Sequence, residues 1–210
     1  MLSAINKYPH FNRYDIPNQI EFGHKSYQPL SPAKPGDYVS FDFKNHQSAW
    51  QRFYNGATAR GFNEIEALLQ KPLIVSFCSP QWGSHADKNI ETLNHLQAAI
   101  NASGGSLLIV SPEEHTEKLA WEHSLTLNIY LDPEHSIAKS FGVFAEDSPA
   151  WDTFSGVDVN VPLLATYVID TSKRVVWRHI ERNLDGNPFT GGMLSAVNHA
   201  ALNDNRKRSA

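Results

Sequence analysis

The sequence predicts a three-layer α/β/α sandwich with a mixed central sheet, preceded by an aromatic and proline-rich arm. Two patterns carry this prediction. Between residues 71 and 142, apolar runs of strand length alternate with segments in which apolar residues have helical spacing. A hairpin and a last helix follow between residues 165 and 200. The chain has 210 residues, of which 41% are hydrophobic, so it can bury the core of one such domain.

The first 34 residues contain four prolines and five aromatic residues without a helical or alternating period. Residues 1–34 contain too many aromatic side chains for a disordered segment. We therefore expect them to form an arm packed on this chain or on a partner. The alternating stretch "DYVSFDF" (37–43) predicts a short strand. Apolar residues at helical spacing then predict a helix near 61–69.

The regular part begins at "PLIVSF", whose continuous apolar run predicts a strand covered on both faces. A helix over 85–101 is expected next, ended by Gly104 and Gly105, and then a second buried strand over 106–111. Ser111 with Pro112 predicts the start of another helix, which "SPEEHTEKLAWEH" continues.

"LNIYLD" predicts a third strand, and "DPEHSIAKSFG" a helix that begins with Asp132 as N-cap and Pro133 and ends at Gly142. The stretches 165–170 and 174–181 predict a hairpin, and a last helix is expected near 188–200. We therefore expect a domain over 35–202 and a polar basic tail over 203–210.

Composition excludes several classes of protein. A net charge of −4 provides no basic field for phosphates, so we expect no nucleic-acid partner. No run of about 18 apolar residues predicts a membrane span, and the N-terminus lacks the apolar region of a signal peptide. Cys78 is the only cysteine and cannot form an intramolecular disulfide. These features together predict a cytoplasmic protein.

Three phrases of the sequence resemble the peroxiredoxin-like (AhpC/TSA) branch of the thioredoxin superfamily over roughly residues 35–200. They are "KPGDYVSFDF" (34–43), "LIVSPEEHTEKLAWEHSLTLNIYLDPEHSIAKSFGV" (108–143) and "ATYVIDTSKRVVWRHIE" (165–181). The resemblance implies a thioredoxin-like fold with a reactive thiol at the start of the helix after the first central strand. There, helix amides and the helix dipole favour the thiolate.

In the motif F-Y-x-G-x-W-C-P-x-C of this family, "FCSPQWGSHA" matches at Phe77 and Trp82. Gly83 then stands in the place of the first cysteine and Ala86 in that of the second. A family proline, usually cis, precedes the "ATYVID" strand, but this chain has Leu164 there, with Pro162 two residues earlier. The arginine that orients peroxide in the family has no counterpart in "PLLATY". The resemblance therefore implies a family member without its active-site cysteines.

Two features of this stretch offer alternative chemistry. Cys78 lies five residues before the family position, at the end of an apolar strand, where a buried inert thiol is the simpler interpretation. Ser84, His85 and Asp87 contain the groups of a hydrolytic triad, but Ser84 as N-cap with Asp87 three residues on better fits a capping box. The same helix start is also a hypothetical site for a small anion.

We therefore expect a protein that has lost thiol peroxidase or oxidoreductase activity and keeps its cleft as a binding or assembly surface. The alternative is a thiol peroxidase acting through Cys78. The ten histidines show no i, i+4 pair, so we expect no metal site, and no cofactor is predicted. A homodimer is expected, and a small ligand or protein partner is left open. The residues assigned to the cleft are Trp82, Gly83, Ser84, His85, Ala86, Pro162 and Leu164.

Overall fold

A computed structural model describes the chain in residues 29–40, 43, 52–55, 58–59, 62–112, 126–150, 154, 156–182 and 190–208. Its elements, in chain order, are β1 (Phe53–Asn55), β2 (Thr58–Ala59), α1 (Phe62–Leu68), β3 (Leu73–Phe77), the 3₁₀ helix η2 (Pro80–Trp82), α2 (Ser84–Ala102), β4 (Ser106–Ser111), β5 (Asn128–Leu131), α4 (Ser136–Ser140), β6 (Ala165–Ile169), β7 (Val175–Ile180) and α5 (Thr190–Arg208).

Within these ranges, seven strands form one sheet in the order β2-β1-β5-β4-β3-β6-β7. β3, β4 and β5 are parallel, whereas β1, β6 and β7 each join antiparallel to a neighbour. A parallel pair needs a crossover, and α2 supplies it between β3 and β4. The predicted mixed sheet is confirmed.

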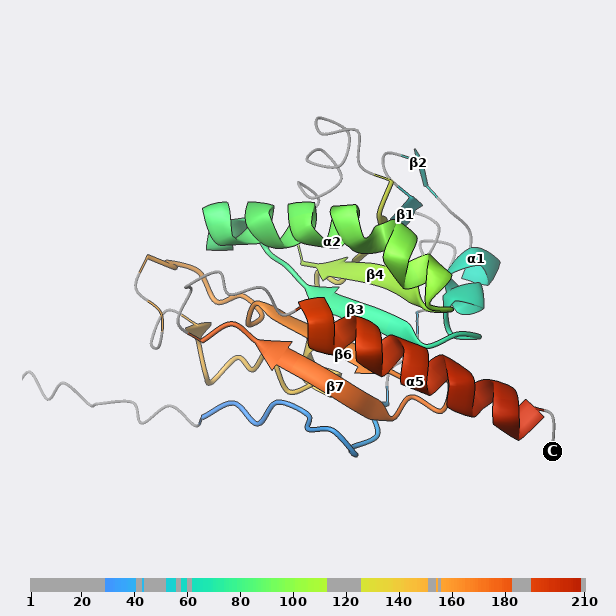
Figure 1. The fold of residues 1–210 in the computed structure, drawn as a ribbon. Helices are drawn as coiled ribbons and strands as arrows, with labels where there is room; N and C mark the ends of the chain where they lie inside the picture. The colour runs from blue at the N-terminus through green and yellow to red at the C-terminus, as the bar shows by residue number, and fades with distance from the viewer. Residues whose placement is uncertain are drawn as a thin grey trace, which may run out of the picture.

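Helices cover both faces of the sheet. α2 and α5 lie side by side on one face (Figure 1). Successive residues of β3 show the two sides: Ser76 accepts a hydrogen bond from Asn89 of α2, whereas the Phe77 ring lies 5.1 Å from Phe141, just after α4. Because side chains of a strand alternate between its faces, α4 lies opposite α2. This arrangement is the predicted three-layer sandwich.

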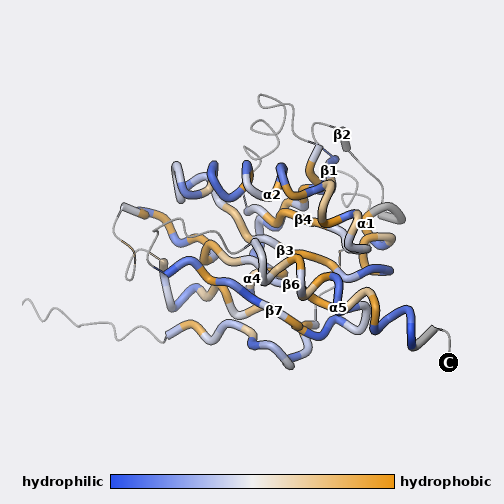
Figure 2. Tube along the Cα trace, in the orientation of Figure 1, coloured by the Kyte–Doolittle hydropathy of each residue, from blue (hydrophilic) through white to orange (hydrophobic). Residues whose placement is uncertain are grey.

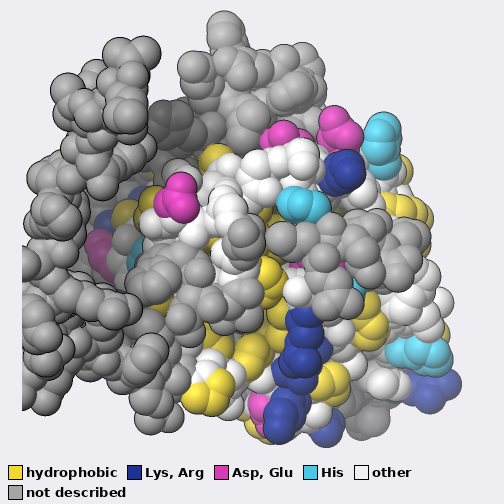
Figure 3. All heavy atoms as spheres, turned by 90° about the vertical axis from the view of Figure 1, so that its left-hand side faces the viewer, with side chains coloured by type: hydrophobic (Ala, Val, Ile, Leu, Met, Phe, Trp, Pro, Cys, Tyr) yellow, Lys and Arg dark blue, Asp and Glu magenta, His cyan; other side chains and the backbone are white. Residues whose placement is uncertain are grey.

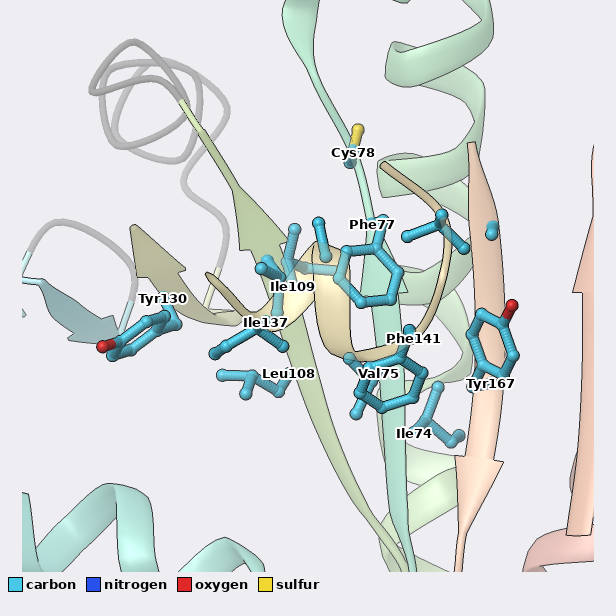
Figure 4. Packing of buried hydrophobic residues seen from close by; sticks show 14 of the residues in the cluster. Ile74, Val75, Phe77, Cys78, Leu108, Ile109, Tyr130, Ile137, Phe141 and Tyr167 are labelled. Carbon is cyan, nitrogen blue, oxygen red and sulfur yellow. The ribbon is translucent and has the colours of Figure 1, made fainter. Parts of the chain in front are cut away.

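The core is centred on β3, β4 and β6, whose residues are all buried. Figure 2 shows that hydrophobic residues concentrate in these central strands, whereas hydrophilic ones mark the outer side of α2 and the end of α5. On the α4 side, the ring of Tyr167 lies 6.2 Å from Phe77 and 4.9 Å from Phe141 (Figure 4). Such edge-to-face contacts add to the free energy gained by burial.

The predicted strand over 37–43 is wrong in its described part. Tyr38 forms only an isolated bridge with Arg174. The segment instead lies along β7, where the Gly36 amide donates to the Val175 carbonyl and the Val175 amide to the Asp37 carbonyl, both at 2.8 Å. It therefore covers the start of the outer edge of β7, which would otherwise expose unpaired backbone groups.

The predicted start of the helix at Asp132 and Pro133 is also wrong, because α4 begins at Ser136. Asp132 still acts as the cap: its carboxylate accepts hydrogen bonds from the amides of Ser136, Ile137 and Ala138 at 2.8 to 3.1 Å. A turn that ends at His135, with φ 54°, displaces the helix start by three residues.

Some expectations fall on residues that lie outside the described ranges. These include residues 1–28 of the arm and the helix expected after Pro112. Residues 203–208 belong to α5 rather than to an irregular tail. The division into 1–34, 35–202 and 203–210 stays a prediction. In the described ranges, no helix has the length and apolar character that a membrane crossing requires.

Candidate functional site

The connection from β3 to α2 is a tight double turn. Ser79 caps η2, because its hydroxyl accepts a hydrogen bond from the Gln81 amide at 3.1 Å. Pro80 occupies the first position of η2, where its missing N–H costs nothing. η2 ends at Trp82, and α2 begins two residues later at Ser84.

The prediction that Ser84 is the N-cap of this helix is wrong. Ser84 is the first helical residue, and the cap is Gly83, which provides no side-chain hydrogen bond. The sequence pattern predicted the wrong cap because Gly83 is both the C-cap of η2 and the N-cap of α2. Its N–H donates to Pro80 at 2.9 Å, and its carbonyl accepts from Ala86 and Asp87 at 2.9 and 3.3 Å. Asp87 does lie in the first turn, where the helix dipole favours its charge.

Gly83, in the place of the first family cysteine, has φ 54° and ψ −133°. This is a conformation that residues with a side chain rarely adopt. The other family position, Ala86, is fully buried on the first turn of α2. Within the described residues, the start of α2 therefore presents no sulfur.

Trp82 joins this turn to the loop before β6. Its indole Nε1 donates to the Pro162 carbonyl oxygen at 2.9 Å, and its ring lies 5.1 Å from Phe154 in an edge-to-face contact. Trp82, Pro162 and Leu164 are all buried. The structure thus brings together the two halves of the predicted cleft, which the buried Trp82 side chain joins directly.

Cys78 follows β3 and is only 2% exposed. Its amide donates to the Val110 carbonyl at 3.0 Å, and its Sγ lies 3.9 Å from the Ala86 carbonyl oxygen. Figure 4 shows Cys78 at the end of β3, apart from the rings of Phe77, Phe141 and Tyr167. The side chain therefore lies beneath the first turn of α2, on the side of the sheet that α2 covers.

Three of the predicted cleft residues reach the surface. Gly83 and Ser84 are exposed, and His85 is half-buried. Figure 3 shows the molecule from the end at which β3 stops and α2 begins. Hydrophobic side chains gather in the lower half of this view, beside a column of Lys and Arg side chains.

Sequence reasoning missed a buried polar group of side chains below this turn. Ser76 and Thr166 share a hydrogen bond of 2.9 Å between β3 and β6, and Asn89 of α2 donates to Ser76 at 3.2 Å. All three are buried. The signal was present as single hydroxyl residues inside the apolar runs "PLIVSF" and "ATYVID". These bonds fix α2 against the two strands, since buried polar groups require partners.

In the part of the chain that the structure describes, no three His, Cys, Asp or Glu side chains lie close enough together to hold one metal ion.

Residues 56–178 match the model of the AhpC/TSA family. This match covers more than half of the chain. The chain belongs to the AhpC/TSA family. Its single cysteine lies outside both positions of the family motif given above, so it is a family member without the usual active-site cysteines.

Solved structures of AhpC/TSA-like proteins share this fold. Peroxidoxin BcpB from Mycobacterium tuberculosis is similar with a TM-score of 0.57 at 17% identity, over 79% of this chain and 97% of that one. The reduced 2-Cys peroxiredoxin of Plasmodium vivax gives 0.55 at 18% identity, over 75% and 79%. AhpC of Enterococcus faecalis gives 0.53 at 15% identity, over 74% and 88%. A sequence comparison with curated proteins gave no match.

Proposed function

We propose that this AhpC/TSA protein has lost thiol peroxidase and oxidoreductase activity and that the surface at the start of α2 serves for binding or assembly. The observation that carries the proposal is the position of the only sulfur. Cys78 is 2% exposed, whereas Gly83 and Ala86 occupy the places of the family thiols. A peroxidase needs a thiolate that peroxide can reach.

The burial of Cys78 under the first turn of α2 supports the same proposal. Its Sγ lies 3.9 Å from the Ala86 carbonyl oxygen, and the preceding turn is held by the Trp82 hydrogen bond to Pro162 and its packing on Phe154. Because Cys78 is 2% exposed, peroxide can reach its thiol only if the structure opens locally. The alternative, a peroxidase acting through Cys78, depends on such an opening.

A peroxidase assay separates the two functions. The wild-type protein and Cys78→Ala are compared for peroxide consumption with dithiothreitol as the reductant. We expect both to consume peroxide at the rate of the reductant alone. Turnover by the wild-type protein that Cys78→Ala lacks would establish the alternative, provided that both proteins have the same far-UV circular dichroism.

The binding role assigns Gly83, Ser84 and His85 to a contact surface. Val159, which is 50% exposed three residues before Pro162, belongs to the adjacent loop. A second copy of this chain is the first partner to test, because a homodimer requires no other component. We propose that the arm over residues 1–34 also contributes to such a dimer and that the protein is cytoplasmic.

Analytical ultracentrifugation tests the assembly role. His85→Glu places a carboxylate on this surface while staying compatible with the first turn of a helix. We expect it to weaken self-association, whereas Asn198→Glu, on the exposed side of α5, leaves it unchanged. A wild-type protein that is monomeric at all concentrations would contradict the homodimer, and the surface would then be left to a small ligand or a different protein.

A further inference from the structure

His135 lies in the turn between β5 and α4, with its ring stacked on Phe144. The two ring centroids are 3.8 Å apart and the ring planes are inclined by 19°. Phe144 is buried, so the imidazole packs on a ring of the core. The backbone of His135 has φ 54°, a conformation that a residue with a side chain keeps only where the surrounding structure holds it. The stack therefore joins this turn to the segment that follows α4.

The surroundings of His135 suit a neutral imidazole better than an imidazolium. Its Nδ1 is buried and makes no hydrogen bond. In a neutral ring this nitrogen can be the one that carries no proton, whereas both nitrogens of an imidazolium are donors and require acceptors. A proton on His135 therefore leaves a charged donor buried without a partner, which is costly to the folded state.

The charged groups that face His135 or share its turn are Asp132, Glu134, Arg52, Lys139 and Glu146. Lys139 repels an imidazolium, and the carboxylates attract one. Each of these carboxylates already has partners: Asp132 accepts from the amides of α4, Glu134 pairs with Arg52 at 2.8 Å, and Glu146 pairs with Lys139 at 2.9 Å. Burial has a larger effect than these charges and lowers the pKa of His135 below 6.5.

The neighbours of Phe144 on both sides are tied to the segment before β6. The Val143 carbonyl accepts a hydrogen bond from the Leu163 amide at 2.9 Å. The Ala145 carbonyl accepts one from the side-chain amide of Asn160 at 3.0 Å. A displacement of Phe144 therefore acts on two hydrogen bonds, one on each side of it.

The same segment holds Trp82. Pro162, which lies between the two residues bonded to the neighbours of Phe144, accepts the indole N–H of Trp82 at 2.9 Å. Asn160 also accepts from the Ala150 amide at 3.2 Å, and the Ala150 carbonyl accepts from the amide of Phe154, which packs on Trp82. A continuous set of contacts thus connects His135 with the turn before α2, as a coupling between two sites requires.

We propose that a proton on His135 releases Phe144 and thereby loosens the segment 160–163 that holds Trp82. The surface at the start of α2 is then ordered at neutral pH and looser in acid. The inference rests on the proposed function, because it makes pH the regulator of that binding or assembly surface.

Amide hydrogen exchange of the wild type and of His135→Asn, followed by NMR at pH 7.5 and pH 5, tests the coupling. The quantity measured is the ratio of the wild-type rate to the variant rate, because at one pH the intrinsic exchange is the same in both proteins. We expect this ratio at Leu163 to rise at least about threefold from pH 7.5 to pH 5, and to rise less at Leu108 in the centre of β4.

The indole N–H resonance of Trp82, assigned with Trp82→Phe, is the second readout. We expect it to shift between pH 7.5 and pH 5 in the wild type and to stay in place in His135→Asn. His85, three residues after Trp82, is present in both proteins, so a shift caused by His85 would persist in the variant. His95→Asn, at an exposed histidine of α2, is the matched control and should behave as the wild type does.

The proposal is overturned if the Leu163 ratio does not rise in acid, if the Leu108 ratio rises as much, or if the Trp82 resonance shifts equally in the wild type and in His135→Asn. An equal rise at Leu108 would show a global loss of stability without a specific effect on the segment 160–163. These readouts do not depend on peroxide consumption or on self-association, so the failure of this inference and the failure of the proposed function are distinguishable.

Discussion

At Gly83 the backbone has φ 54° and ψ −133°, and a β-carbon added there would meet no atom within 4 Å. The space is open, so the constraint on this position comes from the backbone alone. A cysteine at Gly83 would be strained in this conformation unless the turn between η2 and α2 changed. The local backbone therefore also disfavours a thiol at this position.

Replacement of Gly83 by alanine tests this constraint. We expect Gly83→Ala to lower the free energy of unfolding by about 1–3 kcal/mol, the cost of holding a side-chain-bearing residue in this conformation. Gly191→Ala in α5 is the matched control, because its β-carbon also meets nothing within 4 Å but its φ is not positive. That variant should be neutral or stabilised by up to about 1 kcal/mol. Equal urea midpoints for the two variants would contradict the account.

His135 is expected to make stability depend on pH. Its ring stacks on Phe144 with centroids 3.8 Å apart, and burial lowers the pKa of His135 below its ordinary value of 6.5, against a smaller opposing effect of Asp132. The folded state therefore binds fewer protons than the unfolded chain just below pH 6.5. Stability from this residue is complete above pH 6.5 and is lost as the pH falls toward the lowered pKa.

Urea unfolding at pH 8 and pH 5 measures this effect when the wild type is compared with His135→Asn. Asparagine tolerates the left-handed backbone of residue 135, where φ is 54°, and does not titrate. We expect the wild type to lose more stability between the two pH values than the variant does. A wild-type loss no larger than that of His135→Asn would assign the pH dependence to other groups.

At the scale of elements, the Asp132 carboxylate caps the first turn of α4, which begins at Ser136. One carboxylate accepts hydrogen bonds from three successive amides and from the Ser136 hydroxyl, and Asp132 itself is 1% exposed. These bonds satisfy the amides that the first turn of a helix leaves without partners. Because α4 leads into Phe141, the cap also positions the aromatic cluster with Phe77 and Tyr167.

Asp132→Ala is expected to lower the free energy of unfolding by about 1–3 kcal/mol, since it leaves buried amides unpaired. Amide hydrogen exchange of residues 136–138 should accelerate in the same variant. Asp147→Ala, at an exposed site nearby in sequence, should change stability by less than about 0.5 kcal/mol. Unchanged exchange at 136–138 in Asp132→Ala would remove the carboxylate from its capping role.

At the scale of the whole molecule, the order of strands and helices could be predicted because continuous apolar runs such as "PLIVSF" determine which segments are buried on both faces. Helix starts were harder to predict. Ser84 and Pro133 have the residue types of helix starts, but Gly83 and the left-handed His135 moved the actual starts to other positions. Those shifts depend on the positive φ that Gly83 and His135 adopt, which the residue types of a helix start do not specify.

The candidate site was predictable only in part for the same reason. The absence of thiols at positions 83 and 86 follows directly from the sequence, which has Gly83 and Ala86 there. The contacts of Trp82 with Pro162 and Phe154 join residues about seventy to eighty positions apart, and no local sequence pattern predicts such contacts. Asp204 was assigned to a polar tail, because its burial depends on the packing of α5 against the sheet.

The rate of Cys78 oxidation in the native protein, relative to the rate for the same thiol in the chain unfolded by guanidinium, tests the central claim most directly. Hydrogen peroxide is the reagent, and intact-mass spectrometry follows the oxidation. A thiol that is 2% exposed and has no active-site surroundings should react more slowly in the folded protein than in the unfolded chain. Faster oxidation in the folded protein would show an activated thiol and would contradict the loss of peroxidase chemistry.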